Sequence, residues 1–167
     1  MKLTGKAYKF SDDINTDLII SGRYKFSTLD MKELAKHVME DVDPEFSQKV
    51  KPGESFIVAG RNFGCGSSRE QAPLAIKEAG VVAVIAQSFA RIFYRNAVNV
   101  GLTVLEGDTG GIEEGDCLEV DLEKHLIRDE DKKKEIKIKP LPEIMVRVLA
   151  EGGLAAYFKK YGGFKLP

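Results

Sequence analysis

The sequence has few of the residues that hold metal ions or form disulfide bridges. Its 167 residues include two cysteines, Cys65 and Cys117, and two histidines, His37 and His125. A disulfide framework needs more cysteines, and an iron–sulfur cluster usually needs about three or four thiolates. We therefore expect no cofactor in this chain and no metal site that it builds alone.

A strong charge bias and long apolar runs are also absent. The formal net charge is −1, so the sequence lacks the excess of basic residues that is typical of nucleic-acid-binding proteins. No apolar run approaches the roughly 20 residues that a membrane span needs. The opening segment, MKLTGKAYKF, lacks the apolar core of a signal peptide. The sequence therefore predicts a cytoplasmic protein with neither a nucleic-acid nor a membrane partner.

What remains is the composition of an ordinary globular domain. Hydrophobic residues make up 43% of the chain and charged residues 31%, a balance that suits a buried core with a charged surface. A chain of this length can bury such a core without disulfide or metal staples. We expect a single domain that spans residues 1–167.

Apolar runs alternate with helical patterns in the first two thirds of the chain. We expect strands at residues 6–10, 18–20, 55–60, 81–86 and 102–105. We expect helices at residues 30–41 with Asp30 as N-cap, at residues 68–79 with Gly80 as the closing residue, and at residues 88–98 before Gly101. This alternation predicts an α/β fold with a parallel or mixed sheet whose central strands are buried on both faces.

The last third of the chain has a different pattern. Residues 117–122 and 135–138 are expected to form a hairpin, with the charged run DEDKKK in its solvated turn. Pro142 is expected to open a final helix.

The segment GRNFGCGSSRE joins an expected strand to an expected helix. Gly64 and Gly66 allow the backbone to adopt positive φ and to approach a ligand closely. Ser67 and Ser68 would lie where the helix begins, and free N–H groups at such a helix end favour an anion. Arg69 adds a planar fork that matches a carboxylate. The segment therefore predicts a carboxylate or phosphate site beside two hydroxyl groups.

A purely structural role would account for the same serines. Ser67 with Glu70 and Ser68 with Gln71 both have the spacing of a capping box, so the two hydroxyl groups can simply cap the helix. The loop is neither a P-loop nor a dinucleotide-binding turn, since the residues that complete those motifs are missing. Helix cap and ligand site both remain open on the sequence.

Three motifs, in order along the chain, carry a family resemblance. DDINTDLIISGRY, GRNFGCGSSRE and SFARIFYRNAVNVGL together resemble the swivelling domain of the aconitase superfamily. They are most similar to the separate small subunits of isopropylmalate-isomerase-type dehydratases, whose relatives include homoaconitase and dimethylmalate dehydratase. The resemblance covers nearly the whole chain, and it implies a swivelling β/β/α domain with a mixed sheet, like the C-terminal domain of aconitase.

The resemblance also implies an activity that is shared with another protein. A hydro-lyase of this kind isomerises 2- and 3-isopropylmalate by dehydration and rehydration in leucine biosynthesis. Its small subunit acts only with a large subunit that carries a [4Fe–4S] cluster. We therefore expect that cluster-bearing large subunit as partner, in a heterodimer or heterotetramer, and a small branched dicarboxylate as substrate. An alternative from another class is a stand-alone anion-binding regulatory domain.

Residue roles follow from the resemblance, position by position. It makes Ser67 the catalytic base and adds Asp17 as a second catalytic residue. It places Ser68, Arg69 and Thr16 against the substrate. A hydroxyl group is hard to deprotonate, so a serine base needs positive surroundings.

Two positions depart from the family pattern. Phe26 stands where archaeal-type relatives of this kind carry an arginine, so we expect an apolar ring beside the variable group of the substrate. Gln71 replaces the histidine that usually follows GSSRE, and a neutral amide cannot carry the charge of an imidazole. These departures leave the exact substrate open: we expect isopropylmalate first, with homoaconitate or dimethylmalate chemistry as the alternative.

Four other reactive side chains have simpler explanations. Cys65 is expected to be a small packed residue instead of a nucleophile. His37 is expected to be an exposed or hydrogen-bonded residue of a helix. Arg91 and Arg95 are expected to lie on a solvated helix face or in ion pairs.

Overall fold

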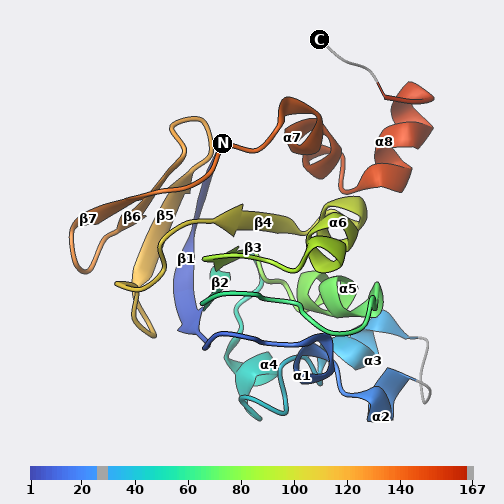
Figure 1. Ribbon diagram of the computed structural model, residues 1–167, viewed down its shortest axis with the longest axis horizontal. Coiled ribbons are helices and arrows are strands. Elements are labelled where there is room, and N and C mark those ends of the chain that lie inside the picture. The colour runs from blue at the N-terminus through green and yellow to red at the C-terminus, as the bar shows by residue number, and fades with distance from the viewer. Residues whose placement is uncertain (26–29, 165–167) are drawn as a thin grey trace.

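A computed structural model describes residues 1–25 and 30–164, and Figure 1 shows its ribbon. Within these residues one sheet of seven strands has the order β4-β3-β2-β1-β5-β6-β7. Four strands are parallel to one another: β1 (Lys2–Lys9), β2 (Ser55–Ala59), β3 (Ala83–Ala86) and β4 (Thr103–Glu106). Three antiparallel strands continue the sheet on the other side of β1: β5 (Cys117–Asp121), β6 (Leu126–Asp129) and β7 (Lys134–Lys137). The predicted mixed sheet is confirmed.

Helices gather on one side of the parallel strands, as Figure 1 shows. In the described ranges they are α1 (Thr16–Ile19), α2 (Gly22–Lys25), α3 (Met31–Ala35), α4 (Phe46–Lys49), α5 (Gln71–Glu78), α6 (Arg91–Val100), α7 (Glu143–Ala150) and α8 (Leu154–Tyr161). Membrane crossing needs a longer and more apolar helix than any of these.

Two hydrophobic cores lie on opposite faces of the sheet. Ile57 and Val84 face the core that packs under the helices. Phe56 and Val58, which lie on either side of Ile57 in β2, face a second core that also contains Leu118 of β5. The antiparallel strands therefore cover the face that the helices leave open. The prediction that the central strands are buried on both faces is confirmed.

The strand predicted at residues 18–20 is wrong, because this segment belongs to α1 and its C-cap. The side chain of Asn15 accepts a hydrogen bond from the backbone N–H of Leu18 at 2.9 Å, which caps a single helical turn. Ile19 and Ile20 are buried in the core under the helices. A short buried apolar run has no periodicity that separates a strand from a helical turn.

The helix predicted at residues 30–41 is shorter than expected and spans only α3. Asp30 is its N-cap, as predicted, and its carboxylate accepts from the N–H of Lys32 at 3.0 Å. Farther along, the N–H of Met39 donates to the carbonyl oxygen of Ile19 at 2.8 Å, and Met39 itself has a φ of 60°. This bond to a distant residue diverts the chain from the helical path.

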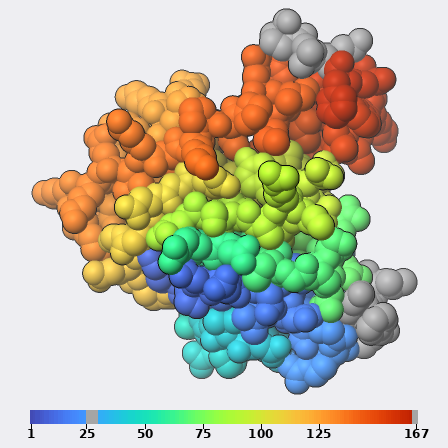
Figure 2. Space-filling model, viewed as in Figure 1, coloured from blue at the N-terminus to red at the C-terminus, as the bar shows by residue number. Residues whose placement is uncertain are grey.

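Two elements near the C-terminus were missed. The predicted hairpin is a three-stranded ribbon, because β6 lies between the two expected strands and DEDKKK begins at its end. The predicted last helix forms as α7 after Pro142, and α8 follows it after Gly153, which has a φ of 129°. In Figure 2, β6 and β7 (orange) and α8 (red) project from opposite sides of the molecule.

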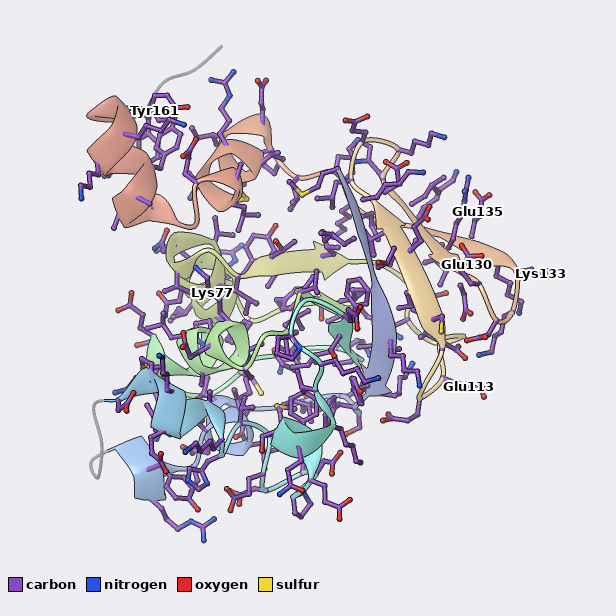
Figure 3. The ribbon with its side chains drawn as sticks, turned by 180° about the vertical axis from the view of Figure 1, so that it is seen from behind. Lys77, Glu113, Glu130, Lys133, Glu135 and Tyr161 are labelled. Atoms are coloured by element: carbon purple, nitrogen blue, oxygen red, sulfur yellow. The ribbon has the colours of Figure 1, made fainter. Side chains whose placement is uncertain are left out.

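One lysine ties the C-terminal helices to the body of the molecule. The ammonium group of Lys77, labelled in Figure 3, donates to the carbonyl oxygen of Val100 at 2.8 Å and to that of Gly152 at 3.1 Å. These carbonyls belong to the end of α6 and to the turn between α7 and α8. A cation is favourable there because carbonyl groups at a helix end carry partial negative charge.

The close approach of β1 to the segment before β2 yields a stability prediction. A Cβ atom at Gly5 would lie 2.5 Å from the carbonyl carbon of Glu54. Gly5→Ala is therefore expected to lower the free energy of unfolding by about 1–3 kcal/mol, as overpacking does. Urea denaturation measures this. The control is Gly111→Ala, whose Cβ would have no neighbour within 4 Å. An unchanged midpoint for Gly5→Ala would contradict the described strand packing.

Candidate active site

Two loops lie side by side beyond the carboxyl ends of β1 and β2. Backbone hydrogen bonds join them, including those from Asp13 N–H to Arg61 O at 2.8 Å, from Gly64 N–H to Ile14 O at 2.7 Å, and from Thr16 N–H to Cys65 O at 2.8 Å. The bonds continue the parallel pairing of the two strands past the edge of the sheet. They bring the start of α1 against the end of the glycine-rich loop.

Residues 87–90 lie on the other side of the glycine-rich loop. The N–H of Phe63 donates to the carbonyl oxygen of Ser88, and the N–H of Ala90 donates to that of Phe63, both at 3.0 Å. Because these residues pair with the loop, α6 begins at Arg91 and not at residue 88 as predicted. The three motifs that carry the family resemblance therefore meet at one edge of the sheet.

Gly64 and Gly66 have the positive φ angles that the sequence predicted, 82° and 98°. A Cβ atom at Gly64 would lie 2.1 Å from Cγ of Phe93, a buried residue of α6. A Cβ atom at Gly66 would lie 3.4 Å from Oγ1 of Thr16. The first glycine therefore lets the loop pass over an aromatic ring, and the second lets it pass beside a threonine hydroxyl.

Both serines of the loop are exposed, and neither caps the helix. Helix α5 begins at Gln71, its N-cap residue is Glu70, and no side chain caps it. The capping interpretation of Ser67 and Ser68 is therefore wrong, and so is the prediction that the helix starts at residue 68. The N–H of Arg69 donates to the carbonyl oxygen of Ser67 at 2.9 Å, which turns the chain before the helix begins.

Ser67 meets a second hydroxyl group from the neighbouring loop. Its Oγ lies 3.2 Å from Oγ1 of Thr16, and either oxygen can donate the hydrogen. Thr16 is 2% exposed, whereas Ser67 is exposed. The buried threonine hydroxyl can therefore orient the side chain of the exposed serine.

Arg69 is paired with Asp17. Its Nη1 forms an ion pair with Oδ1 of Asp17 and donates to the carbonyl oxygen of Ile20 at 3.3 Å. Its Nε is buried and has no hydrogen-bond partner among the described residues. The structure thus brings Thr16, Asp17, Ser67 and Arg69 together. Ser68 lies exposed in the same loop, and Phe26, another predicted substrate contact, lies outside the described residues.

Other side chains of the sequence analysis lie as the simpler explanations predicted. Cys65 is half-buried, and this burial, with the charge of Asp13, raises the pKa of its thiol, so the nucleophilic thiolate is disfavoured. His37 stacks on Tyr24, with ring centroids 3.9 Å apart, and its Nδ1 lies 2.5 Å from a carboxylate oxygen of Glu40. His37 is therefore a hydrogen-bonded residue, as expected.

Arg91 and Arg95 are exposed on α6, as the solvated-face interpretation predicted. They line a surface hollow of about 460 Å³ together with Phe89, Tyr94 and Met145. Ser67 and Arg69 are not among the residues that line this hollow.

The sequence analysis missed one acidic cluster. Carboxylate oxygens of Asp116, Asp129 and Asp131 lie within 4.8 Å of one another, where β5 meets the turn after β6. The ammonium group of Lys132 pairs with Asp116 and lies 3.8 Å from Asp129, so it supplies the positive charge within this cluster. The run DEDKKK had been interpreted as a solvated turn, and nothing in its pattern shows that a distant aspartate packs against it.

This chain offers a poor donor set for an iron–sulfur cluster. Its two cysteines lie apart, Cys65 in the glycine-rich loop and Cys117 on β5, and a cluster needs about three or four ligands close together. The residues at the candidate site are instead hydroxyl groups, a carboxylate and a guanidinium. Such groups bind and orient a small anion and move a proton.

Comparisons with known proteins show the family of the chain. The family model of the aconitase C-terminal domain matches residues 9–109. The 3-isopropylmalate dehydratase small subunit 2 of Archaeoglobus fulgidus is 61% identical over 166 residues, which cover 99% of this chain and 100% of that protein. The 3-isopropylmalate dehydratase small subunit of Caldicellulosiruptor saccharolyticus is 56% identical over 161 residues, which cover 95% of this chain and 92% of that protein.

A solved structure has the same fold. The crystal structure of 3-isopropylmalate dehydratase from Methanocaldococcus jannaschii superposes with a TM-score of 0.93 at 52% identity. The match covers 97% of this chain and 96% of that one. This likeness bears out the fold class that the sequence predicted, an α/β domain like the C-terminal domain of aconitase.

The raised pKa of Cys65 gives a prediction of thiol reactivity. A thiol with a raised pKa holds less thiolate at neutral pH than an ordinary cysteine, and its alkylation rate keeps rising at higher pH. In a Cys117→Ser variant, iodoacetamide should therefore label Cys65 at least roughly tenfold more slowly at neutral pH than it labels exposed Cys117 in a Cys65→Ser variant. Rapid labelling of Cys65 at neutral pH would mark it as a reactive thiol and contradict this description.

Proposed function

Because this chain belongs to the family of 3-isopropylmalate dehydratase small subunits, with an aconitase C-terminal domain, we propose that it supplies half of the active site of that dehydratase. The complete enzyme is a hydro-lyase of leucine biosynthesis, and it interconverts 2- and 3-isopropylmalate by removing and restoring water. We propose that the chain forms a single cytoplasmic domain, residues 1–167, which joins a large subunit in a heterodimer or heterotetramer.

One observation carries the proposal: Ser67 and Arg69 share an exposed loop in a chain that is 61% identical, end to end, to a named small subunit. A hydroxyl base and a carboxylate-binding fork are what a proton abstraction beside a carboxylate requires. Water competes for the exposed hydroxyl group of Ser67 and reaches the guanidinium of Arg69 only in part. A second protein surface that covers the loop would exclude that water, which agrees with a site completed by a partner.

In the proposed reaction, Ser67 removes the proton from the carbon next to a substrate carboxylate. The proton passes to the deprotonated Oγ and restores the serine hydroxyl, and the electron pair of the C–H bond forms a double bond to the neighbouring carbon as the hydroxyl group leaves that carbon. The cluster expected on the large subunit would supply the Lewis-acid chemistry that assists the loss of the hydroxyl group. Returning water to the opposite carbon, with the proton given back by Ser67, completes the isomerisation.

The neighbours of Ser67 support this role. Thr16 is placed to donate a hydrogen bond to Oγ at 3.2 Å, and such a bond favours the deprotonated form. Arg69 contributes positive charge and is proposed to bind a substrate carboxylate, with Ser68 as a further hydroxyl contact. Asp17, proposed as part of the same site, pairs with Arg69. Phe26 is proposed to contact the variable group of the substrate.

Reconstitution with a cluster-bearing large subunit from a relative tests the proposed function. The isolated chain should show no turnover, and the mixture should form a stable complex and interconvert the isopropylmalates. Comparing kcat/KM for isopropylmalate, homoisocitrate and dimethylmalate identifies the substrate. Faster turnover of homoisocitrate or dimethylmalate would move the assignment to a sister enzyme. Tight binding of anions without any partner, and no activity with one, would favour the stand-alone regulatory domain.

Replacing the proposed base tests its role. Ser67→Ala in the reconstituted complex is expected to lower kcat by about 10²–10⁴-fold while KM changes little, because the general base is lost and the binding groups remain. Steady-state kinetics measures both constants. Ser47→Ala on α4 is the matched control and should leave them unchanged. Near-normal turnover in Ser67→Ala would exclude Ser67 as the base.

A further inference from the structure

Arg69 is the most enclosed charged group of the candidate site, and its guanidinium is only partly satisfied. Its side chain is 16% exposed. Nη1 contacts Asp17 and the carbonyl oxygen of Ile20, whereas the buried Nε has no hydrogen-bond partner among the described residues. A buried donor without an acceptor is unfavourable. The guanidinium is therefore held in an arrangement that a further acceptor would improve.

Asp17 is the more loosely held member of the pair. Its side chain is 64% exposed, and it lies on α1, a helix of four residues. The carbonyl oxygen of Ile20 anchors the same nitrogen of Arg69 from the backbone. Asp17 is largely in contact with water already, and an incoming carboxylate replaces it as counter-ion, so the exchange does not leave the partly buried Arg69 unpaired.

The contact between Asp17 and Arg69 has the chemistry of a carboxylate bound to a guanidinium. This is the same contact that the proposed function requires of a substrate carboxylate at Arg69. Two carboxylates cannot take one nitrogen of Arg69 in the same position, and their like charges repel each other. Asp17 and an incoming diacid therefore compete.

We infer that Asp17 occupies the anion position of Arg69 in the unliganded chain, and that a substrate carboxylate binds there by displacing it. The inference rests on the proposed function for the identity of the ligand, a branched dicarboxylate. Asp17 is then a positioning residue that acts through Arg69. It holds the guanidinium in place near Ser67. Because an anion must displace Asp17, an anion with low affinity for Arg69 does not bind.

Titration of the full-length chain tests the exchange without a partner subunit. The probe is 2-isopropylmalate, and the signal is the Nε–Hε resonance of Arg69 in arginine-labelled protein, assigned by its loss in Arg69→Lys. Asp17→Asn removes the competing charge and should lower the dissociation constant roughly three- to tenfold, the effect of one nearby exposed charge. Equal or weaker binding by this variant would overturn the inference.

Asp13→Asn is the matched control. It removes one negative charge from the same loop, where Asp13 accepts a hydrogen bond from Asn62 at 3.0 Å and does not contact Arg69. Asparagine also tolerates the φ of 56° at this position. Its dissociation constant should stay within about twofold of the wild-type value, because a charge away from the guanidinium is screened by solvent. An equal gain in both variants would mean general electrostatics and would overturn the inference.

A second measurement follows Asp17 in the wild-type chain, with Arg69→Gln as the reference for an unpaired Asp17. As 2-isopropylmalate saturates the site, the carboxyl ¹³C resonance of Asp17 should move to the position that it has in Arg69→Gln, where the pair is absent. A resonance that does not move while the Arg69 signal saturates would show that Asp17 stays bound, against the inference.

The titration and the turnover assay can fail independently. If the reconstituted complex is inactive on isopropylmalate while Asp17→Asn still binds the diacid more tightly, the proposed function fails and the exchange stands. If the complex is active and the titration shows no gain, the exchange fails alone. In the active complex, the exchange predicts that Asp17→Asn lowers KM, and an unchanged or higher KM would overturn it.

Discussion

The candidate site depends on the backbone hydrogen bonds that join residues 13–16 to residues 61–65. Neither segment is part of a regular strand, yet they pair in parallel because β1 and β2 direct them from adjacent positions in the sheet. One segment brings Thr16 and Asp17, and the other brings Ser67 and Arg69. Without this pairing the four side chains would belong to two unconnected loops.

The rest of the fold holds that pairing in place. Strands β2 and β3 are buried on both faces, so the edge from which the loops emerge is fixed by two cores at once. Phe93 of α6 lies directly under Gly64, which leaves the loop one path over the aromatic ring. The charged ribbon of β5–β7, where Figure 3 labels Glu130, Lys133 and Glu135, is built around the second core, away from the helices.

The reactive groups of the site are paired within the chain. The hydroxyl group of Ser67 meets that of Thr16, and the guanidinium of Arg69 meets the carboxylate of Asp17. Such pairing suits a subunit that exists before its partner and substrate arrive. An exposed serine in water is a weak base, and an arginine with its own counter-ion attracts few stray anions. The proposed function and the proposed exchange together require a second surface that excludes water and a diacid that replaces Asp17 at Arg69.

The sequence by itself determined the fold class, the core strands and the three motifs. A continuous apolar run such as residues 55–60 avoids water only if the strand is buried on both faces of the sheet. Gly64 and Gly66 indicate positive φ angles that residues with a side chain rarely adopt. Only the tertiary structure decided that the segment at residues 18–20 is a helical turn, that α5 begins after the serines, and that Arg69 meets Asp17. These outcomes depend on bonds between residues far apart in the chain, such as Met39 with Ile19 and Thr16 with Cys65, and local patterns carry no information about such partners.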